Sequence, residues 1–225
     1  MVFLMNKKAQ LTIFIIIGVV LLMVVFISIS LSNYRNDENQ ILSEKTIPIN
    51  NFVESCLEYV SENATLTLTR YGGQISELVY DKIPEISQME SELSEYINTN
   101  IDSCINGFMI FNEQGFVITP SIHIIETRIN QEDMTFTLTY PIKIQKQDSV
   151  TELDTFVFVY QGINLPYLRN IAMQILDDKE WLNRDLLLSE LVRKDAFLDI
   201  TSYGKYIVYS LSTDKIRFNF GEIVE

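Results

Sequence analysis

The stretch MTFTLTYPIKIQ, residues 134–145, decides the fold class, because its large apolar side chains occupy every second position. Even-numbered positions hold Met, Phe, Leu, Tyr or Ile, and most odd-numbered positions hold Thr, Lys or Gln. A period of two predicts a β-strand that buries one face and exposes the other to water. Pro141 interrupts the alternation, which predicts an edge strand, a bulge or two consecutive strands at this point.

Further strand patterns lie on both sides of this stretch. Residues 122–129 form the expected partner strand, joined to it through residues 130–133. Residues 156–160 are apolar on both faces, so we expect this strand at the centre of the sheet. An antiparallel meander is the simplest arrangement of these strands. Three more strands are predicted near the C-terminus, at residues 197–202, 206–211 and 216–220.

Apolar residues at helical spacing predict two helices before the sheet. The first begins at Pro48 and ends at the pair Gly72-Gly73, which is typical of a helix C-terminus. The second begins with the capping-box sequence SQME, residues 87–90. Two later helices are predicted over residues 165–181 and 184–192. The sequence therefore predicts an α+β fold in which helices pack on an antiparallel sheet.

The two cysteines, Cys56 and Cys104, lie on the apolar faces of the two helices predicted before the sheet. Outside the cytoplasm, an even pair in matching positions suggests a disulfide, which here would close a loop of about 49 residues. The alternative is a pair of buried free thiols that act as small apolar side chains. Two cysteines are too few for a zinc site, and the single histidine, His123, does not complete one.

The run LTIFIIIGVVLLMVVFISISL, residues 11–31, carries no charged residue. At 1.5 Å per residue, a helix of this length spans roughly 30 Å, the thickness of the hydrocarbon core of a bilayer. Two lysines precede the run and acidic residues follow it, which places the N-terminus in the cytoplasm. The alternatives are a secretory signal, cleaved at the faint small-x-small match SIS, residues 28–30, and a buried core helix.

These patterns divide the chain into four parts. Residues 1–10 form a basic cytoplasmic N-terminus, and Leu11 to Leu31 form a single transmembrane helix in contact with the lipid bilayer. Residues 32–47 are polar and lack apolar periodicity, so they are expected to form a stalk. Residues 48–225 form the extracytoplasmic α+β domain. The expected location is therefore the cell membrane, with the folded domain outside.

The sequence KKAQ, residues 7–10, followed at once by the apolar run, resembles the processing region of archaeal type IV pilin-like precursors. In that family a basic pair and a small residue precede the cut, so the resemblance implies cleavage between Ala9 and Gln10. The stretch QLTIFIIIG, residues 10–18, also resembles the start of uncharacterised archaeal membrane-anchored proteins. Pilins usually carry Glu at the fifth mature position, which is Phe14 here, and this favours anchoring over filament assembly. The alternative is a signal anchor that is never cleaved.

The composition and a few individual residues limit which functions the sequence supports. The formal net charge of −13 and the lack of a basic stripe argue against nucleic-acid binding. His123 lies among isoleucines and is expected to be packed rather than catalytic. With 30 acidic residues, carboxylate pairs arise by chance, and none is singled out. Asn63, in the sequon Asn63-Ala64-Thr65, is a candidate glycosylation site on a predicted helix. No catalytic, metal or cofactor-binding residue is predicted.

The expected function is that of a membrane-anchored cell-surface protein with a structural, adhesive or envelope-interaction role and no catalysis. Assembly into a pilin-like filament is one alternative. An extracytoplasmic ligand-binding or hydrolytic domain is the other, and it predicts a concave pocket with converging polar groups. The sequence leaves the protein partner in the envelope and the oligomeric state open.

Overall fold

The computed structural model describes Leu21, Met23–Val25, residues 46–177 and residues 196–224. Leu21 and Met23–Val25 are helical, and their side chains are exposed. Within the described part of the chain, no helix is both long and apolar enough to cross a membrane.

Several predictions from the sequence fall outside the described residues. These are the cytoplasmic segment 1–10 with the processing residues Ala9 and Gln10, the rest of the apolar run 11–31, stalk residues 32–45 and the helix at 184–192. Residues 46 and 47, which the sequence assigned to the stalk, are helical.

The first helix of the folded domain covers residues 46–70, and residues from Pro48 onward form one compact unit. Its buried apolar residues recur at spacings of three and four: Ile49, Val53, Cys56, Leu57, Val60, Ala64 and Leu68. The helix ends as predicted, because Gly72 and Gly73 both have positive φ and the Gly73 N–H donates to Leu68 O at 2.9 Å. The apolar face predicted from the sequence is therefore the buried face.

The second helix, α2 (Ile86–Ile105), also buries one apolar face: Met89, Leu93, Ile97, Ile101 and Ile105. Its N-cap is Glu85 rather than Ser87, and no side chain caps it. The carboxylate of Glu90 instead accepts a hydrogen bond from the backbone N–H of Ile129 at 2.9 Å. The capping-box prediction is therefore wrong, because this side chain satisfies the end of a strand. A 3-10 turn, η1 (Asn106–Phe108), and a short helix, α3 (Met109–Asn112), follow α2.

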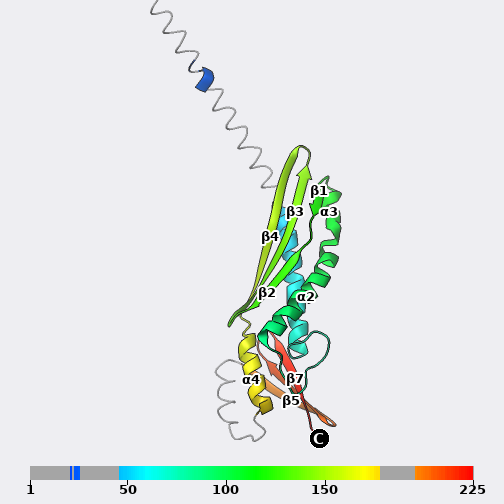
Figure 1. Ribbon diagram of the computed structural model, residues 1–225, viewed down its shortest axis with the longest axis vertical. Coiled ribbons are helices and arrows are strands. Elements are labelled where there is room, and N and C mark those ends of the chain that lie inside the picture. The colour runs from blue at the N-terminus through cyan, green and yellow to red at the C-terminus, as the bar shows by residue number, and fades with distance from the viewer. Residues whose placement is uncertain (1–20, 22, 26–45, 178–195, 225) are drawn as a thin grey trace, which may run out of the picture. The chain divides into compact units, whose positions relative to one another are not determined.

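Four strands form the larger sheet (Figure 1): β1 (Val117–Pro120), β2 (Ile124–Ile129), β3 (Asp133–Lys146) and β4 (Ser149–Gln161). β2 pairs with the first half of β3 and β1 with its second half, both antiparallel. β4 pairs antiparallel along the other side of β3. At Pro141 the register shifts so that two residues of β3 oppose one of β4, which confirms the bulge.

β3 buries its even-numbered side chains, as the alternation predicts: Met134, Phe136, Leu138, Tyr140, Ile142 and Ile144. They share one hydrophobic core with the buried faces of helix 46–70 and α2. The prediction that residues 156–160 lie at the centre of the sheet is wrong, because β4 pairs only with β3 among the described strands. Apolar residues on both faces of this strand do not reflect burial on both faces, since Val157 and Val159 are exposed.

The three C-terminal strands form a second antiparallel sheet, in the order β5 (Phe197–Tyr203), β6 (Tyr206–Ser212) and β7 (Arg217–Ile223). Residues before α2 continue this sheet beyond β7. The Gly221 N–H donates to Val79 O at 2.8 Å, and the Asp81 N–H donates to Gly221 O at 2.9 Å. Only glycine fits at position 221, since a Cβ there would collide with the ring of Tyr80.

Helix α4 (Leu165–Asp177) confirms the described part of the helix predicted at 165–181. It buries Arg169, whose Nε donates to Pro84 O at 2.6 Å and whose Nη2 lies 2.8 Å from Glu85 Oε2. Because Pro84 and Glu85 directly precede α2, this arginine ties α4 to the start of α2. The described domain is therefore α+β, as expected, with two antiparallel sheets.

Candidate functional site

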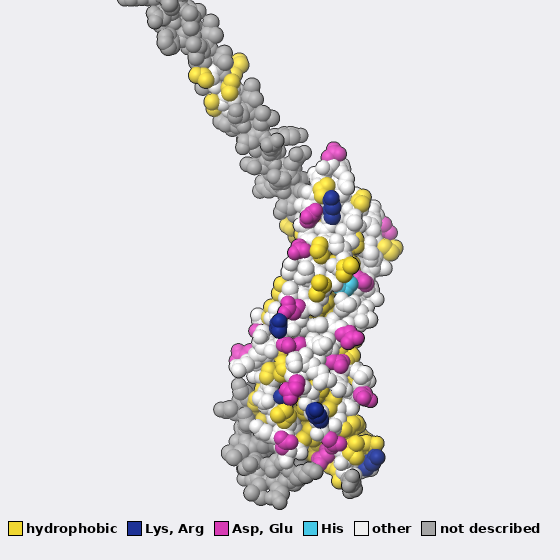
Figure 2. Space-filling model, in the orientation of Figure 1, with side chains coloured by type: hydrophobic (Ala, Val, Ile, Leu, Met, Phe, Trp, Pro, Cys, Tyr) yellow, Lys and Arg dark blue, Asp and Glu magenta, His cyan; other side chains and the backbone are white. Residues whose placement is uncertain are grey.

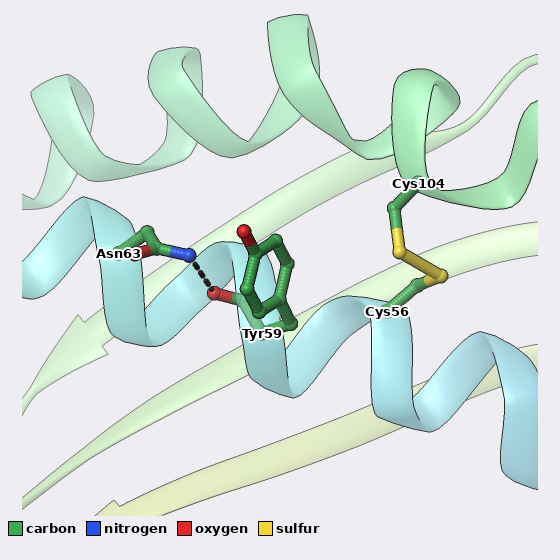
Figure 3. The surroundings of a disulfide bond; sticks show 4 residues. All are labelled: Cys56, Tyr59, Asn63 and Cys104. Atoms are coloured by element: carbon green, nitrogen blue, oxygen red, sulfur yellow. Dashed lines mark hydrogen bonds between the residues drawn. A yellow bond between two sulfur atoms is a disulfide. The ribbon is translucent and has the colours of Figure 1, made fainter.

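Cys56 and Cys104 form a disulfide between helix 46–70 and α2, which confirms the pairing predicted from the sequence (Figure 3). Their Cα atoms lie 5.7 Å apart, and Cys56 is buried in the hydrophobic core. Figure 3 shows both helices lying over strands of the sheet, so the bond joins two elements of one layer. The alternative of two free thiols is therefore wrong, and the crosslink fixes the spacing of the two helices.

Asn63 lies on the same helix as Cys56 and is half-buried (Figure 3). Its Nδ2 donates to Tyr59 O at 2.9 Å, one turn earlier. The sequon threonine, Thr65, is fully buried, and its hydroxyl donates to Ser61 O at 2.9 Å. In the folded domain the sequon is thus helical and internally hydrogen-bonded, so a glycan would have to be added before this helix packs.

His123 lies in the connection between β1 and β2 and packs on α2. Its Nε2 lies 3.3 Å from Asn98 O, and since a carbonyl only accepts, Nε2 carries the proton. Its Nδ1 lies 3.7 Å from Asp102 Oδ1, which makes a contact between charges when the imidazole is protonated. The ring meets the Tyr140 ring edge-on, with centroids 5.4 Å apart. These contacts hold the connection between the strands against α2.

Tyr140 is the buried member of this cluster. Burial raises the pKa of its hydroxyl, and the negative charge of Asp102 raises it further, so the phenol stays neutral at physiological pH. His123 contacts a carbonyl, a carboxylate and an aromatic ring, and its contacts include no serine, threonine or cysteine that it could activate. We interpret the cluster as packing and hydrogen bonding, as the sequence predicts for His123.

Two surface hollows lie elsewhere on the domain. The larger, about 560 Å³, lies between residues 74–84 and Gln88 at the start of α2. The second, about 430 Å³, is bordered by the turns that precede β3 and follow β4, and by the turn between β6 and β7. Its lining includes the carboxylates of Glu132, Asp133 and Asp214. Neither of these hollows includes His123 or the disulfide.

The described domain has no cluster of side chains suited to bind a metal ion. Among the described residues, no three or more His, Cys, Asp or Glu side chains are grouped so that they could hold a metal ion. Comparisons of the chain with protein-family models, with curated proteins and with solved structures find no match. Function is therefore inferred from residues and geometry.

The sequence did not predict two features of the folded domain. The first is the contact between Asp102 and His123, which lie on different elements and meet only through packing. The second is that the outer side of β4 is a strand edge. One local signal for the edge exists: residues 155–161, TFVFVYQ, combine strong β propensity with no charge. That signal does not by itself distinguish an edge strand from a central one.

Proposed function

We propose that this chain is a single-pass membrane-anchored protein of the cell surface, with a structural, adhesive or envelope-interaction role and no catalytic function. Leu11 to Leu31 would cross the bilayer, the N-terminus would face the cytoplasm, and residues 48–225 would fold outside.

The observation that carries this proposal is the disulfide between Cys56 and Cys104. Structural disulfides form and persist in oxidising compartments and are rare in the cytosol. This bond uses both cysteines of the chain and lies against the core of the domain. Together with an uncharged run of membrane-spanning length N-terminal to the domain, it supports export with retention at the membrane.

Tethering supplies the physical mechanism of the proposed role. A helix lodged in the bilayer confines the domain to the membrane surface, which raises its effective concentration for partners held on the same surface. The net charge of −13 for the whole chain would keep such a domain soluble at that surface.

The test is fractionation of cells that produce the full chain, with free thiols alkylated before lysis. We expect full-length protein in the membrane fraction, both cysteines unmodified, and removal of the domain by protease added outside the cells. Ile16→Arg combined with Val20→Arg should move the protein out of the membrane, because each central arginine costs roughly 2.5–3.5 kcal/mol on insertion. Ile16→Leu with Val20→Leu is the matched control. Full-length wild-type protein dissolved in the cytosol with alkylated thiols would overturn the proposal.

A further inference from the structure

The outer side of β4 is an unpaired strand edge. β4 pairs with β3 on one side, and no described strand pairs with its other side. Free N–H and C=O groups of an edge strand can pair with another chain, and proteins usually guard them with Lys, Pro or charge. The first half of β4 carries Glu152 and Asp154, but residues 155–161, TFVFVYQ, carry no charge and no proline. At its end, Lys215 Nζ donates to Gln161 O, so among the described residues the part of this edge open to an added strand is residues 155–160.

Side chains on both faces of this half-strand are left partly uncovered. On the outer face, Val157 and Val159 are 50% and 40% exposed. On the inner face, Phe158 and Tyr160 are half-buried, with ring centroids 6.0 Å apart. Phe158 also stacks on Phe136 of β3, with ring centroids 6.0 Å apart, which fixes its position at the edge. An added strand would therefore find β-branched side chains on one face and aromatic rings on the other.

Helix 46–70 packs on the same hydrophobic core as Phe158 and Tyr160, and it carries a row of acidic side chains. Glu62 is half-buried on this helix. Burial raises the pKa of the Tyr160 hydroxyl, and the charge of Glu62 raises it further. Glu58 and Glu54 lie one and two turns earlier on the same helical face, and both are exposed. None of the three glutamates makes an ion pair with a described residue.

The acidic row and the uncharged half of β4 match in length. Eight steps of helix, from Glu54 to Glu62, rise about 12 Å. Four steps of strand, from residue 156 to residue 160, rise about 13 Å. Figure 2 shows acidic and hydrophobic side chains on the outer face of the sheet, over the part of the surface where Figure 1 places β2, β3 and β4. A strand added to β4 would have its inward side chains beside the rings of Phe158 and Tyr160.

We propose that the free edge of β4 binds, by strand addition, an extended basic segment of a partner protein. Lys or Arg at alternate positions would lay their aliphatic stems on Phe158 and Tyr160 and reach the carboxylates of Glu58 and Glu62. The intervening positions would hold Val, Ile or Thr beside Val157 and Val159. This inference deepens the interaction role proposed above and rests on it for the place where the partner is met.

Charge decides between this partner and a second copy of the chain. Pairing of β4 with β4 of another copy would bring two rows of unpaired glutamates toward each other across the new sheet. Each copy carries a net charge of −13, so the approach is opposed before any strand pairs. A basic strand has the opposite sign, and it gains the same backbone hydrogen bonds.

The binding test uses the full chain in detergent micelles and a short fluorescein-labelled peptide of alternating Lys and Val. We expect saturable binding by fluorescence anisotropy, which weakens as salt is raised. Glu58→Lys with Glu62→Lys should weaken binding at least roughly tenfold, because two attractive contacts become repulsive. The matched control, Glu92→Lys with Glu95→Lys on the polar face of α2, makes the same change in net charge and should bind nearly as the wild type does.

Backbone pairing is tested with the same peptide methylated at each backbone amide, which keeps the charge but cannot donate to β4. We expect it to lose binding. Equal binding of the methylated peptide, or an equal loss in the α2 control, would show attraction by net charge alone and overturn the proposal. A dimer of the chain by analytical ultracentrifugation, dissociated by Val157→Lys, would make a second copy the occupant and overturn it also. None of these outcomes depends on the fractionation result, so the two proposals fail separately.

Discussion

Removal of the disulfide should cost the domain a large part of its stability. The perturbation is Cys56→Ala with Cys104→Ala, or chemical reduction of the wild-type chain. Cys56 and Cys104 are separated by 48 positions, and the chain-entropy model assigns a loop of that size about 4 kcal/mol at 25 °C. Alanine is the appropriate replacement because Cys56 is only 3% exposed. A serine there would bury a polar hydroxyl group, which costs stability unless the group is hydrogen-bonded.

The expected shift in melting temperature follows from the size of the compact unit. Residues 48–225 make a unit of about 180 residues, for which the entropy of unfolding is about 0.4 kcal/mol per kelvin. A loss of about 4 kcal/mol therefore lowers the melting temperature by about 10 °C. The alanine variant should lose slightly more than the reduced wild type, since it also removes two sulfur atoms that pack in or against the core.

The assay is urea unfolding of the full chain in detergent, followed by circular dichroism, with and without reductant. The double variant should be insensitive to reductant, which makes it the control for effects of reductant elsewhere. Reduction that changes the free energy of unfolding by less than about 1 kcal/mol would refute the reasoning, because the chain-entropy model cannot give so little for this loop. A fall in the slope of the transition would instead indicate a change in the unfolded state.

Two further predictions concern single buried groups. Burial raises the pKa of the Tyr209 hydroxyl to about 12, helped by the charge of Glu222 and by the hydrogen bond from Tyr209 to Glu222 Oε2 at 3.2 Å. Because the unfolded chain loses this proton near pH 10 and the folded chain retains it, stability should fall as pH rises from 10 to 12. Glu222→Gln should reduce that fall, as urea unfolding at pH 9 and 11 would show, and an unchanged pH dependence would contradict it. Ser61 is fully buried, and its hydroxyl has no hydrogen-bond partner among the described residues. Ser61→Ala should therefore stabilise the domain by about 1 kcal/mol in the same assay, and destabilisation would mean that the hydroxyl is satisfied.

Much of the local structure was predictable because it depends on short-range periodicity. The alternation at residues 134–145 predicts the buried face of β3 side chain by side chain, and the C-terminal strands are found where their patterns lie. The disulfide was predictable for the same reason. An apolar face identifies which side of each helix is buried, and Cys56 and Cys104 lie on such faces.

Predictions failed where the local sequence is compatible with two arrangements and does not favour either. SQME at residues 87–90 has the pattern of a capping box, yet Glu90 accepts the N–H of Ile129, which lies 39 positions away. A carboxylate accepts a hydrogen bond from whichever donor lies near it in the folded chain. The local sequence does not show which donor that will be. The predicted position of β4 was wrong for the same reason. Residues 156–160 are apolar on both faces, and this pattern is compatible with an edge strand as well as with a central one.

The sequence by itself determined the α+β class, the buried faces, the cysteine pair and the uncharged run at residues 11–31, since all of these follow from local spacing and composition. Only the tertiary structure decided that β4 is an edge and that helix 46–70 packs on the same core as Phe158 and Tyr160. The candidate interaction surface depends on those two facts. Strand order and the contact between a helix and a strand are set by how the whole core packs, and local patterns place few limits on either.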